Sequence, residues 1–247
     1  MNYGDIISIV EVLLLAVVFI FLFRFIFLNY SSKVRKPAAW VLAVKRGMIP
    51  AELLKAEKKY PDRIRFYNIW LQIGRIVNDS IQGDFAELGV YKGETAQIIH
   101  LCAPERKLHL LDTFDGFPSE DLKKESGKAT GYTSEHFADT SLEKVRSRLG
   151  EKENIVYHKG YFPDSAKEIE ESKFAFVSMD ADLHNPTRAG LEFFYPRLSK
   201  GGIILIHDYN TDWPELMHAV DVFVSGIPES LVPVPDADST VMIIKSQ

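Results

Sequence analysis

The sequence predicts an α/β protein with a Rossmann-like, doubly wound and mostly parallel sheet of seven strands, preceded by a single transmembrane helix. Beyond Gly83, short apolar runs of strand length alternate with helical stretches, which is typical of a parallel sheet covered by helices. The last two apolar runs, residues 231–234 and 241–244, are separated by a polar turn and predict a C-terminal antiparallel hairpin. A long apolar segment near the amino terminus predicts the membrane helix.

Residues 6–28 are almost wholly apolar, interrupted only by Ser8, Glu11 and Arg24. As a helix this segment would be roughly 34 Å long, which is enough to cross a bilayer. The first five residues contain no Lys or Arg, and no cleavage pattern follows residue 28. These observations favour a retained single-pass anchor over a cleaved signal peptide or a helix lying in the membrane interface.

The charges around this segment predict its orientation. Basic residues follow the segment and only the amino terminus precedes it, so the positive-inside rule places the large domain on the cytoplasmic side of the membrane. The only cysteine is Cys102, which excludes an intramolecular disulfide and agrees with a reducing compartment. The net charge of −5 gives no basic footprint for nucleic acid. The basic residues are Lys33, Arg35, Lys36, Lys45 and Arg46.

We divide the 247 residues into a membrane anchor over 1–32, a helical cap over 33–82 and a sheet domain over 83–247. In the cap, apolar residues recur at three- and four-residue spacing, broken by Gly47, Pro50 and Pro61. In the sheet domain the first five strands are predicted at 85–89, 108–111, 155–158, 174–177 and 203–206. The sequence leaves the oligomeric state open, and a homo-oligomer is compatible with it.

The first predicted strand leads into a glycine-containing turn, residues 87–95. Glycines here let the backbone turn sharply and approach a ligand, and the next helix presents free amide groups to an anion. Three side chains, Val90, Tyr91 and Lys92, replace the glycine-rich turn of a dinucleotide site, so a smaller cofactor with a carboxylate fits better. A strand–turn–helix without any ligand is the alternative.

The next two strands also end in residues suited to a nucleoside. Asp112, followed by Thr113, stands where an acidic side chain binds ribose hydroxyls, although a helix cap is an alternative for Asp112. After the third strand, Gly160 and Phe162 offer space and an aromatic ring for an adenine.

Polar residues gather where the fourth and fifth strands end. Asp180 and Asp182 follow one apolar run, and His207 and Asp208 follow the next. Because the carboxyl ends of neighbouring parallel strands lie side by side, we expect these four side chains to converge. Asp180 and Asp182 reach one site only if the backbone leaves the strand at Met179, since side chains alternate along a strand.

Five segments in this order, 83–93, 111–118, 137–146, 179–182 and 207–223, resemble the macrocin O-methyltransferase family. The resemblance runs from the helical cap to the C-terminus and leaves the membrane segment outside. It implies a magnesium-dependent enzyme that uses S-adenosylmethionine to methylate hydroxyl groups, often on sugars of secondary metabolites. A metal-bound hydroxyl has a lowered pKa and a fixed direction, and a nearby carboxylate can then take its proton.

The resemblance also implies roles for individual residues. One departure from the family is His207, where Asp or Glu is usual, and imidazole suits transition metals better than magnesium. His207 therefore either binds a different divalent metal itself or contacts the metal ligands without binding the metal. The resemblance implies that Asp112 holds the ribose of the cofactor, that Asp180 and Asp208 bind the metal, and that Asp182 is the general base. It implies that five residues line the methionine end of the cofactor: Glu87, Gly89, Tyr91, Gly93 and Thr95.

The long polar segment 119–140 is suited to a substrate lid and contains His136, a candidate acid–base group that is alternatively solvated or packed. The resemblance implies an acceptor hydroxyl on a small molecule, a glycosylated metabolite or a glycolipid, and the sequence does not select among them. Two other functions compete with methyl transfer: a membrane-anchored, metal-dependent glycosyltransferase, and a non-catalytic scaffold with a methyltransferase fold.

Overall fold

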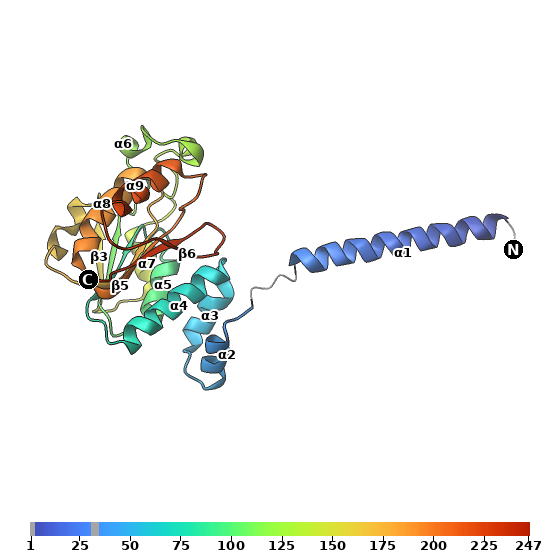
Figure 1. Ribbon diagram of the computed structural model, residues 1–247, viewed down its shortest axis with the longest axis horizontal. Coiled ribbons are helices and arrows are strands. Elements are labelled where there is room, and N and C mark those ends of the chain that lie inside the picture. The colour runs from blue at the N-terminus through green and yellow to red at the C-terminus, as the bar shows by residue number, and fades with distance from the viewer. Residues whose placement is uncertain (1–2, 31–34) are drawn as a thin grey trace. The chain divides into compact units, whose positions relative to one another are not determined.

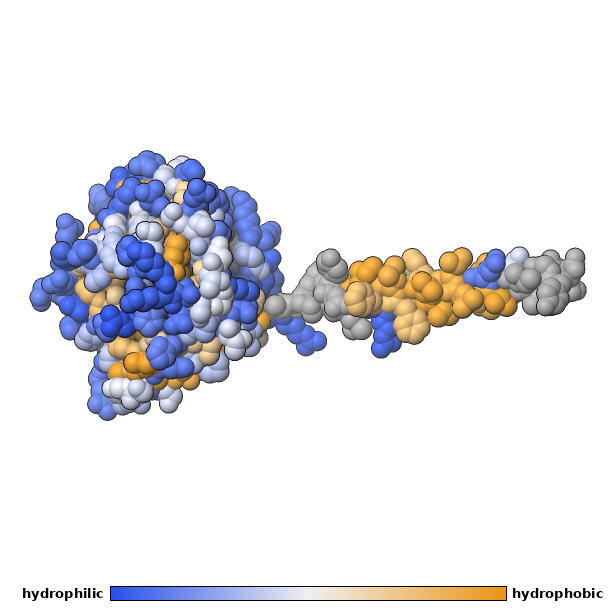
Figure 2. Space-filling model, turned by 90° about the horizontal axis from the view of Figure 1, so that it is seen from above, coloured by the Kyte–Doolittle hydropathy of each residue, from blue (hydrophilic) through white to orange (hydrophobic). Residues whose placement is uncertain are grey.

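The computed structural model describes residues 3–30 and 35–247, which fall into two compact units, Met1–Ala38 and Ala39–Gln247 (Figure 1). The first unit contains α1, Tyr3–Tyr30. Within it Ser8–Ile26 has a mean hydropathy of 2.8, and it is the one helix among the described residues that is long and apolar enough to cross a membrane. Figure 2 shows apolar side chains over most of the coloured part of this helix.

Three helices precede the sheet: α2 (Ala38–Lys45), which lies in the second unit apart from its first residue, α3 (Ala51–Lys59) and α4 (Arg63–Asn78). Asp62 starts α4, because its carboxylate accepts hydrogen bonds from the backbone N–H groups of Ile64 and Arg65. The ring of Trp40 packs edge-on against Phe66, with 5.3 Å between centroids. Trp40 also belongs to the same hydrophobic core as side chains of the sheet, so these helices and the sheet share one core.

The sheet has seven strands, as the sequence predicts, and their spatial order is β3-β2-β1-β4-β5-β7-β6. Strands β1 to β5 are parallel, and β7 pairs antiparallel with both β5 and β6. Pro233 lies in the edge strand β6, where a residue without an N–H is tolerated. The strands are β1 Asp84–Leu88, β2 Leu108–Asp112, β3 Ile155–Lys159, β4 Phe174–Met179, β5 Leu198–Ile206, β6 Val232–Pro233 and β7 Val241–Ile244.

One strand is longer than expected. β5 starts at Leu198 and not at 203, and its pairing with β4 shifts register between Phe174 and Phe176. The polar residues before Ile203 therefore lie in the strand although they break the apolar pattern, because they occupy the irregular part of the ladder.

Helices cover both faces of the sheet, and alternate strand residues point into two separate cores. Phe85 and Ile203 belong to one core, which the helical cap shares, while Ala86 and Ile204 belong to the other. The remaining helices are α5 Glu94–Cys102, α6 Ser119–Leu122, α7 Leu142–Leu149, α8 His184–Phe194 and α9 Pro214–Val224, with short 3-10 segments at Gly127–Gly131, Asp164–Ile169 and Tyr195–Arg197.

The ends of β1 and β4 approach closely at Gly89. This residue has a φ of +83°, and a Cβ atom added to it would lie 1.9 Å from the carbonyl oxygen of Asp180. The backbone N–H of Asp180 also donates to the carbonyl of Leu88 at 2.8 Å. We expected the glycine to make room for a ligand, and Gly89 does line a cavity. However, it is the backbone of Asp180 that leaves no room for a side chain at residue 89.

We therefore predict that Gly89→Ala destabilises the fold by about 3 kcal/mol, because the added methyl group overlaps Asp180 and the positive φ disfavours alanine. Gly74→Ala in α4 is the matched control: no described heavy atom within 4 Å would meet its Cβ. A helical Gly→Ala change should stabilise by about 0.5–1 kcal/mol. Urea midpoints of the full chain in detergent measure both, and equal midpoints for the two variants would contradict the prediction.

Candidate active site

A cavity of about 580 Å³ opens at the carboxyl ends of β1, β2, β4 and β5. This volume lies in the range of small-molecule sites. The helical cap contributes Tyr60 and Arg65 to its wall, and the segment between β2 and α7 contributes Phe117 and Phe137. The cavity is therefore built by the sheet, the cap and the predicted lid together.

Glu87 is the most deeply buried acidic residue in this wall, with 1% of its surface exposed. The backbone N–H of Ala96 donates to its carboxylate, but its Oε2 atom has no hydrogen-bond partner among the described residues. Burial raises the pKa of Glu87 well above its usual range, while the nearby Arg65 opposes this rise. A buried acceptor without a partner is costly, so a ligand with a donor is expected at this position.

Three other residues predicted for the cofactor, Gly89, Tyr91 and Thr95, also line the cavity. Gly93 does not. It precedes α5 with a φ of +77°, and a Cβ there would lie 3.0 Å from Cγ1 of Val145 in α7. Its glycine is therefore explained by backbone conformation and helix packing, and not by contact with a ligand.

Asp112 lies in the cavity wall, but its carboxylate already binds backbone. Oδ2 accepts from the N–H groups of Val90 and Tyr91 at 2.6 and 2.9 Å, and Oδ1 accepts from the N–H of Phe114 at 2.7 Å. The residue therefore clamps the turn after β1 to the end of β2. A carboxylate has about four acceptor sites, so this clamp leaves capacity for a ligand hydroxyl.

The remaining predicted cofactor residues also line the cavity. Thr113 donates its hydroxyl to the carbonyl of Gly116 at 2.7 Å, and the N–H of Gly160 donates to the carbonyl of Asp112 at 3.0 Å. The ring of Phe162 stacks on Phe194 with 5.8 Å between centroids, so most of its surface contacts the core.

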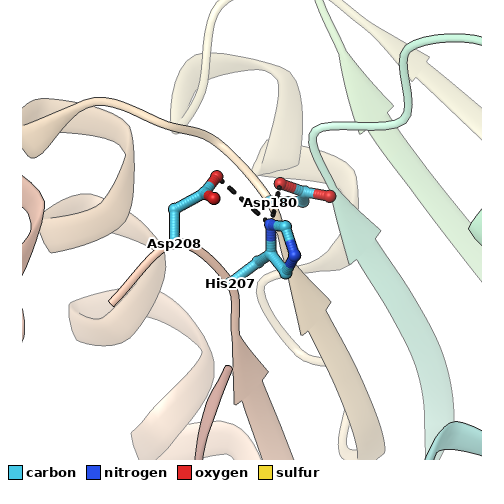
Figure 3. Close-up of side chains that lie close together, drawn as sticks. All are labelled: Asp180, His207 and Asp208. Atoms are coloured by element: carbon cyan, nitrogen blue, oxygen red, sulfur yellow. Dashed lines mark hydrogen bonds and ion pairs between the residues drawn. The ribbon is translucent and has the colours of Figure 1, made fainter. Parts of the chain in front are cut away.

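The polar residues at the ends of β4 and β5 do converge. β4 ends at Met179, which meets the condition for Asp180 and Asp182 to face one site. Nδ1 of His207 lies 3.1 Å from Oδ1 of Asp180 and 3.2 Å from Oδ2 of Asp208. Figure 3 shows this nitrogen facing both carboxylates. One donor atom from each of these three residues lies within 4.8 Å of the others.

Arg65 is a site residue that the sequence analysis missed. Its guanidinium donates to Oδ2 of Asp180 at 2.8 Å, across 115 residues of sequence, and only 10% of its side chain is exposed. The available signal was a basic residue inside the apolar helical pattern, between Ile64 and Phe66. A second missed residue is Asp238, whose carboxylate lies 3.8 Å from Nε2 of His207.

The surrounding charges shift the pKa values of Asp180 and Asp182 in opposite directions. Burial alone would raise the pKa of Asp180, but Arg65 and His207 outweigh it and hold that pKa well below its usual range. For Asp182, burial and the neighbouring charges of Asp180 and Asp208 all raise the pKa. Asp182 also has a φ of +57° and hydrogen-bonds Asp208. Asp180 thus stays ionised, whereas Asp182 is the group that readily holds a proton.

His136 does not join this cluster. It is exposed, lies outside the cavity lining, and its Nδ1 accepts from the backbone N–H of Thr133 at 3.0 Å. Its ring lies 5.0 Å from that of Tyr132. The structure therefore separates His136 from Asp182, its predicted catalytic partner. The lid segment itself reaches the cavity through Asp121 and Phe137.

The sheet order, with β7 antiparallel between β5 and β6, and a cavity at the ends of β1 and β4 define the fold of S-adenosylmethionine-dependent methyltransferases. The O-methyltransferase NovP superposes with a TM-score of 0.66 at 24% identity, covering 75% of this chain and 81% of NovP. The calicheamicin methyltransferase CalS11 gives 0.58 at 21% identity, covering 85% of this chain and 94% of CalS11. At these identities the two structures support the fold.

The chain belongs to the macrocin O-methyltransferase family, whose model matches residues 62–240. One relative, a tetracenomycin-C rhamnosyl 4'-O-methyltransferase from Streptomyces olivaceus, is 25% identical over 60% of this chain. Another, the mycinamicin III 3''-O-methyltransferase from Micromonospora griseorubida, is 28% identical over 59%. The matches span 61% and 62% of the lengths of these relatives.

We predict that His207 makes the stability of the metal-free protein depend on alkaline pH. Burial lowers the pKa of His207, but Asp180 and Asp208 outweigh it and raise it to about 10 from 6.5. The contribution of its charged form is complete below about pH 6.5 and is lost as pH rises toward 10, at most about 5 kcal/mol. Urea unfolding with a chelator present, between pH 6.5 and 9.5, measures the loss.

His207→Asn is the control, because asparagine keeps an N–H donor but does not titrate in this range. The variant should lose less stability than the wild type across this range. Parallel curves for the two proteins would show that His207 is not the titrating group.

Proposed function

We propose that this chain transfers the methyl group of S-adenosylmethionine to a hydroxyl group of a sugar or glycosylated metabolite, with the help of a divalent cation. The observation that carries the proposal is the carboxylate of Glu87, which is buried in the cavity wall with its Oε2 unpartnered among the described residues. The ammonium group of the cofactor's methionine part would satisfy that acceptor. Membership in the macrocin O-methyltransferase family supports the same cofactor.

The rest of the cavity suits the other parts of this cofactor. Asp112 keeps acceptor capacity for a ribose hydroxyl, and Gly160 and Phe162 line the wall where the base would lie. The chemistry that the cofactor supplies is an electrophilic methyl group on a sulfonium. The chain's own contribution is to bind it with its ammonium at Glu87 and to direct the acceptor hydroxyl toward it.

The donor trio of Asp180, His207 and Asp208 fits a divalent cation. One donor atom from each of the three residues lies within 4.8 Å of the others, so all three could bind the same ion. Two carboxylates with one imidazole suit a transition metal such as Mn²⁺ better than Mg²⁺. An ion held there would lower the pKa of an acceptor hydroxyl and fix its direction.

Two further side chains complete the proposed mechanism. Asp182 in its ionised form takes the proton of the acceptor hydroxyl, since the raised pKa makes that form a stronger base than an ordinary aspartate. Arg65 is a positioning residue: it holds Oδ2 of Asp180, which leaves Oδ1 to face His207 and the proposed ion.

The names of the relatives support a glycosylated acceptor, since they methylate a rhamnosyl tetracenomycin and mycinamicin III. Family membership favours methyl transfer over the glycosyltransferase alternative. The Oε2 atom of Glu87, which has no hydrogen-bond partner among the described residues, favours a working cofactor site over a non-catalytic scaffold.

The proposal extends to the location of the enzyme. The apolar stretch Ser8–Ile26 has the length of a membrane span, a property that it shares with signal sequences. The absence of basic residues before it and their presence after it favour a retained anchor with the catalytic domain in the cytoplasm. A membrane anchor makes a glycolipid acceptor a reasonable candidate beside soluble glycosylated metabolites.

Two single substitutions should separate cofactor binding from proton removal. Glu87→Gln should weaken S-adenosylmethionine binding by about 10- to 100-fold, because it removes a charged hydrogen bond. Asp182→Asn should keep cofactor affinity and lower methyl transfer to a glycosylated acceptor by about 10²- to 10⁴-fold. Calorimetric titration of the full chain and transfer of a radiolabelled methyl group measure the two effects. Absence of cofactor binding by the wild type would refute the proposed function.

A third substitution tests the metal. His207→Asp should lower the ratio of Mn²⁺ to Mg²⁺ affinity by about tenfold, because an oxygen ligand replaces the nitrogen that disfavours Mg²⁺. The ratio matters because the added negative charge strengthens binding of both ions. Asp238→Asn is the control, since Asp238 adjoins His207 outside the donor trio. Competitive titration with the two ions measures the ratio, and an unchanged ratio would remove His207 from the ligand set.

A further inference from the structure

The helix α2 exposes apolar side chains although it is anchored in the core. Trp40 is fully buried, whereas Val41 and Leu42 are 51% and 46% exposed and Met48, just after the helix, is 68% exposed. The N–H of Met48 donates to the carbonyl of Ala43 at 3.0 Å, so a backbone bond holds Met48 against the end of α2. These three residues form an exposed apolar face on a helix whose buried side chain is Trp40.

Positive charges accompany this apolar face. Lys45 and Arg46 are exposed and lie four residues after Val41 and Leu42, which is the spacing of neighbours on one side of a helix. Large apolar side chains beside exposed Lys and Arg are typical of helices that lie in the interface of an anionic membrane. Their long side chains keep the charge at the headgroups while the apolar part is buried.

The chain connection keeps this face near a membrane if α1 spans one. Seven residues separate Tyr30, the end of α1, from Ala38, the start of α2, and seven extended residues reach at most about 25 Å. A tethered surface of this kind experiences a high effective lipid concentration, so a modest affinity is enough. Figure 1 shows α2 at the end of the domain opposite α6.

We propose that Val41, Leu42 and Met48, together with Lys45 and Arg46, bind the headgroup region of an anionic membrane and hold the catalytic domain against it. We call these five residues the α2 face. The proposal rests on the membrane anchor proposed above, and it goes beyond that anchor because it gives the domain its own contact with lipid. The alternative occupant of the α2 face, a second copy of this chain, is an outcome of the test.

The test uses the full chain in lipid nanodiscs with single fluorescent labels. Since Cys102 is the only native cysteine, a Cys102→Ser background accepts one label at a time at Met48→Cys, Val222→Cys or Leu15→Cys. Val222 is the matched control, because it is an apolar residue of α9 with 57% exposure, and α9 lies away from α2. Headgroup nitroxide lipids quench labels at the surface, and acyl-chain nitroxides quench a label at Leu15 within the proposed span.

With one chain per anionic nanodisc, the Met48 label should be quenched at least twofold more than the Val222 label. Adding Lys45→Glu and Arg46→Glu should remove that difference, because each basic residue near an anionic surface contributes about fivefold to binding. Equal quenching of the Met48 and Val222 labels, with strong quenching at Leu15, would overturn the docking proposal while leaving the anchor intact.

Two other outcomes would also overturn the proposal. Weak quenching at Leu15 would remove the anchor on which it rests. Protection of the Met48 label only in nanodiscs that hold two chains would assign the α2 face to a second copy. Methyl-transfer activity of the same samples is measured separately, so failure of docking is distinguishable from failure of the proposed function.

Discussion

The backbone contact between Gly89 and Asp180 sets the geometry on which the candidate site depends. With the place of a Cβ only 1.9 Å from the carbonyl of Asp180, residue 89 accepts no side chain unless one of the two strand ends moves. Glu87, one residue before the end of β1, interacts electrostatically with Asp180, which follows β4 directly. Glu87, which we propose binds the cofactor, therefore acts on Asp180, which we propose binds the metal, and Arg65 interacts electrostatically with both.

This crowding of acidic groups is balanced by two cationic partners from different parts of the chain. Arg65 reaches Asp180 from α4, and His207 reaches both Asp180 and Asp208 from the end of β5. Asp180 thus remains a stable anion, while Asp182, without such a partner in the hydrogen bonds and ion pairs of the described residues, has a raised pKa. Two aspartates two positions apart obtain opposite protonation behaviour from their surroundings, which is how acid–base roles are divided in enzyme sites.

The helical cap is part of both the core and the site. Trp40 and Phe66 of the cap belong to the same hydrophobic core as side chains of the sheet. The hydroxyl of Tyr60 forms a hydrogen bond of 2.9 Å with the hydroxyl of Thr95 at the cavity wall. The side chains of the cap that face the sheet therefore complete the cavity, while those of α2 that face outward form the apolar and basic α2 face. In our proposals one short group of helices connects the site to the membrane.

The sequence by itself determined the order of strands and helices along the chain and the apolar amino-terminal helix, because both follow from the periodicity of apolar side chains. It also determined that Asp180, His207 and Asp208 meet, because each follows the end of a strand and the carboxyl ends of neighbouring parallel strands lie side by side. Only the tertiary structure decided what each polar side chain contacts. Arg65 binds Asp180 across 115 residues, Asp112 clamps the turn after β1, Gly93 packs on α7, and His136 lies outside the cavity. These contacts depend on how elements that are distant in sequence pack together, and the spacing of residues along the chain does not specify that packing.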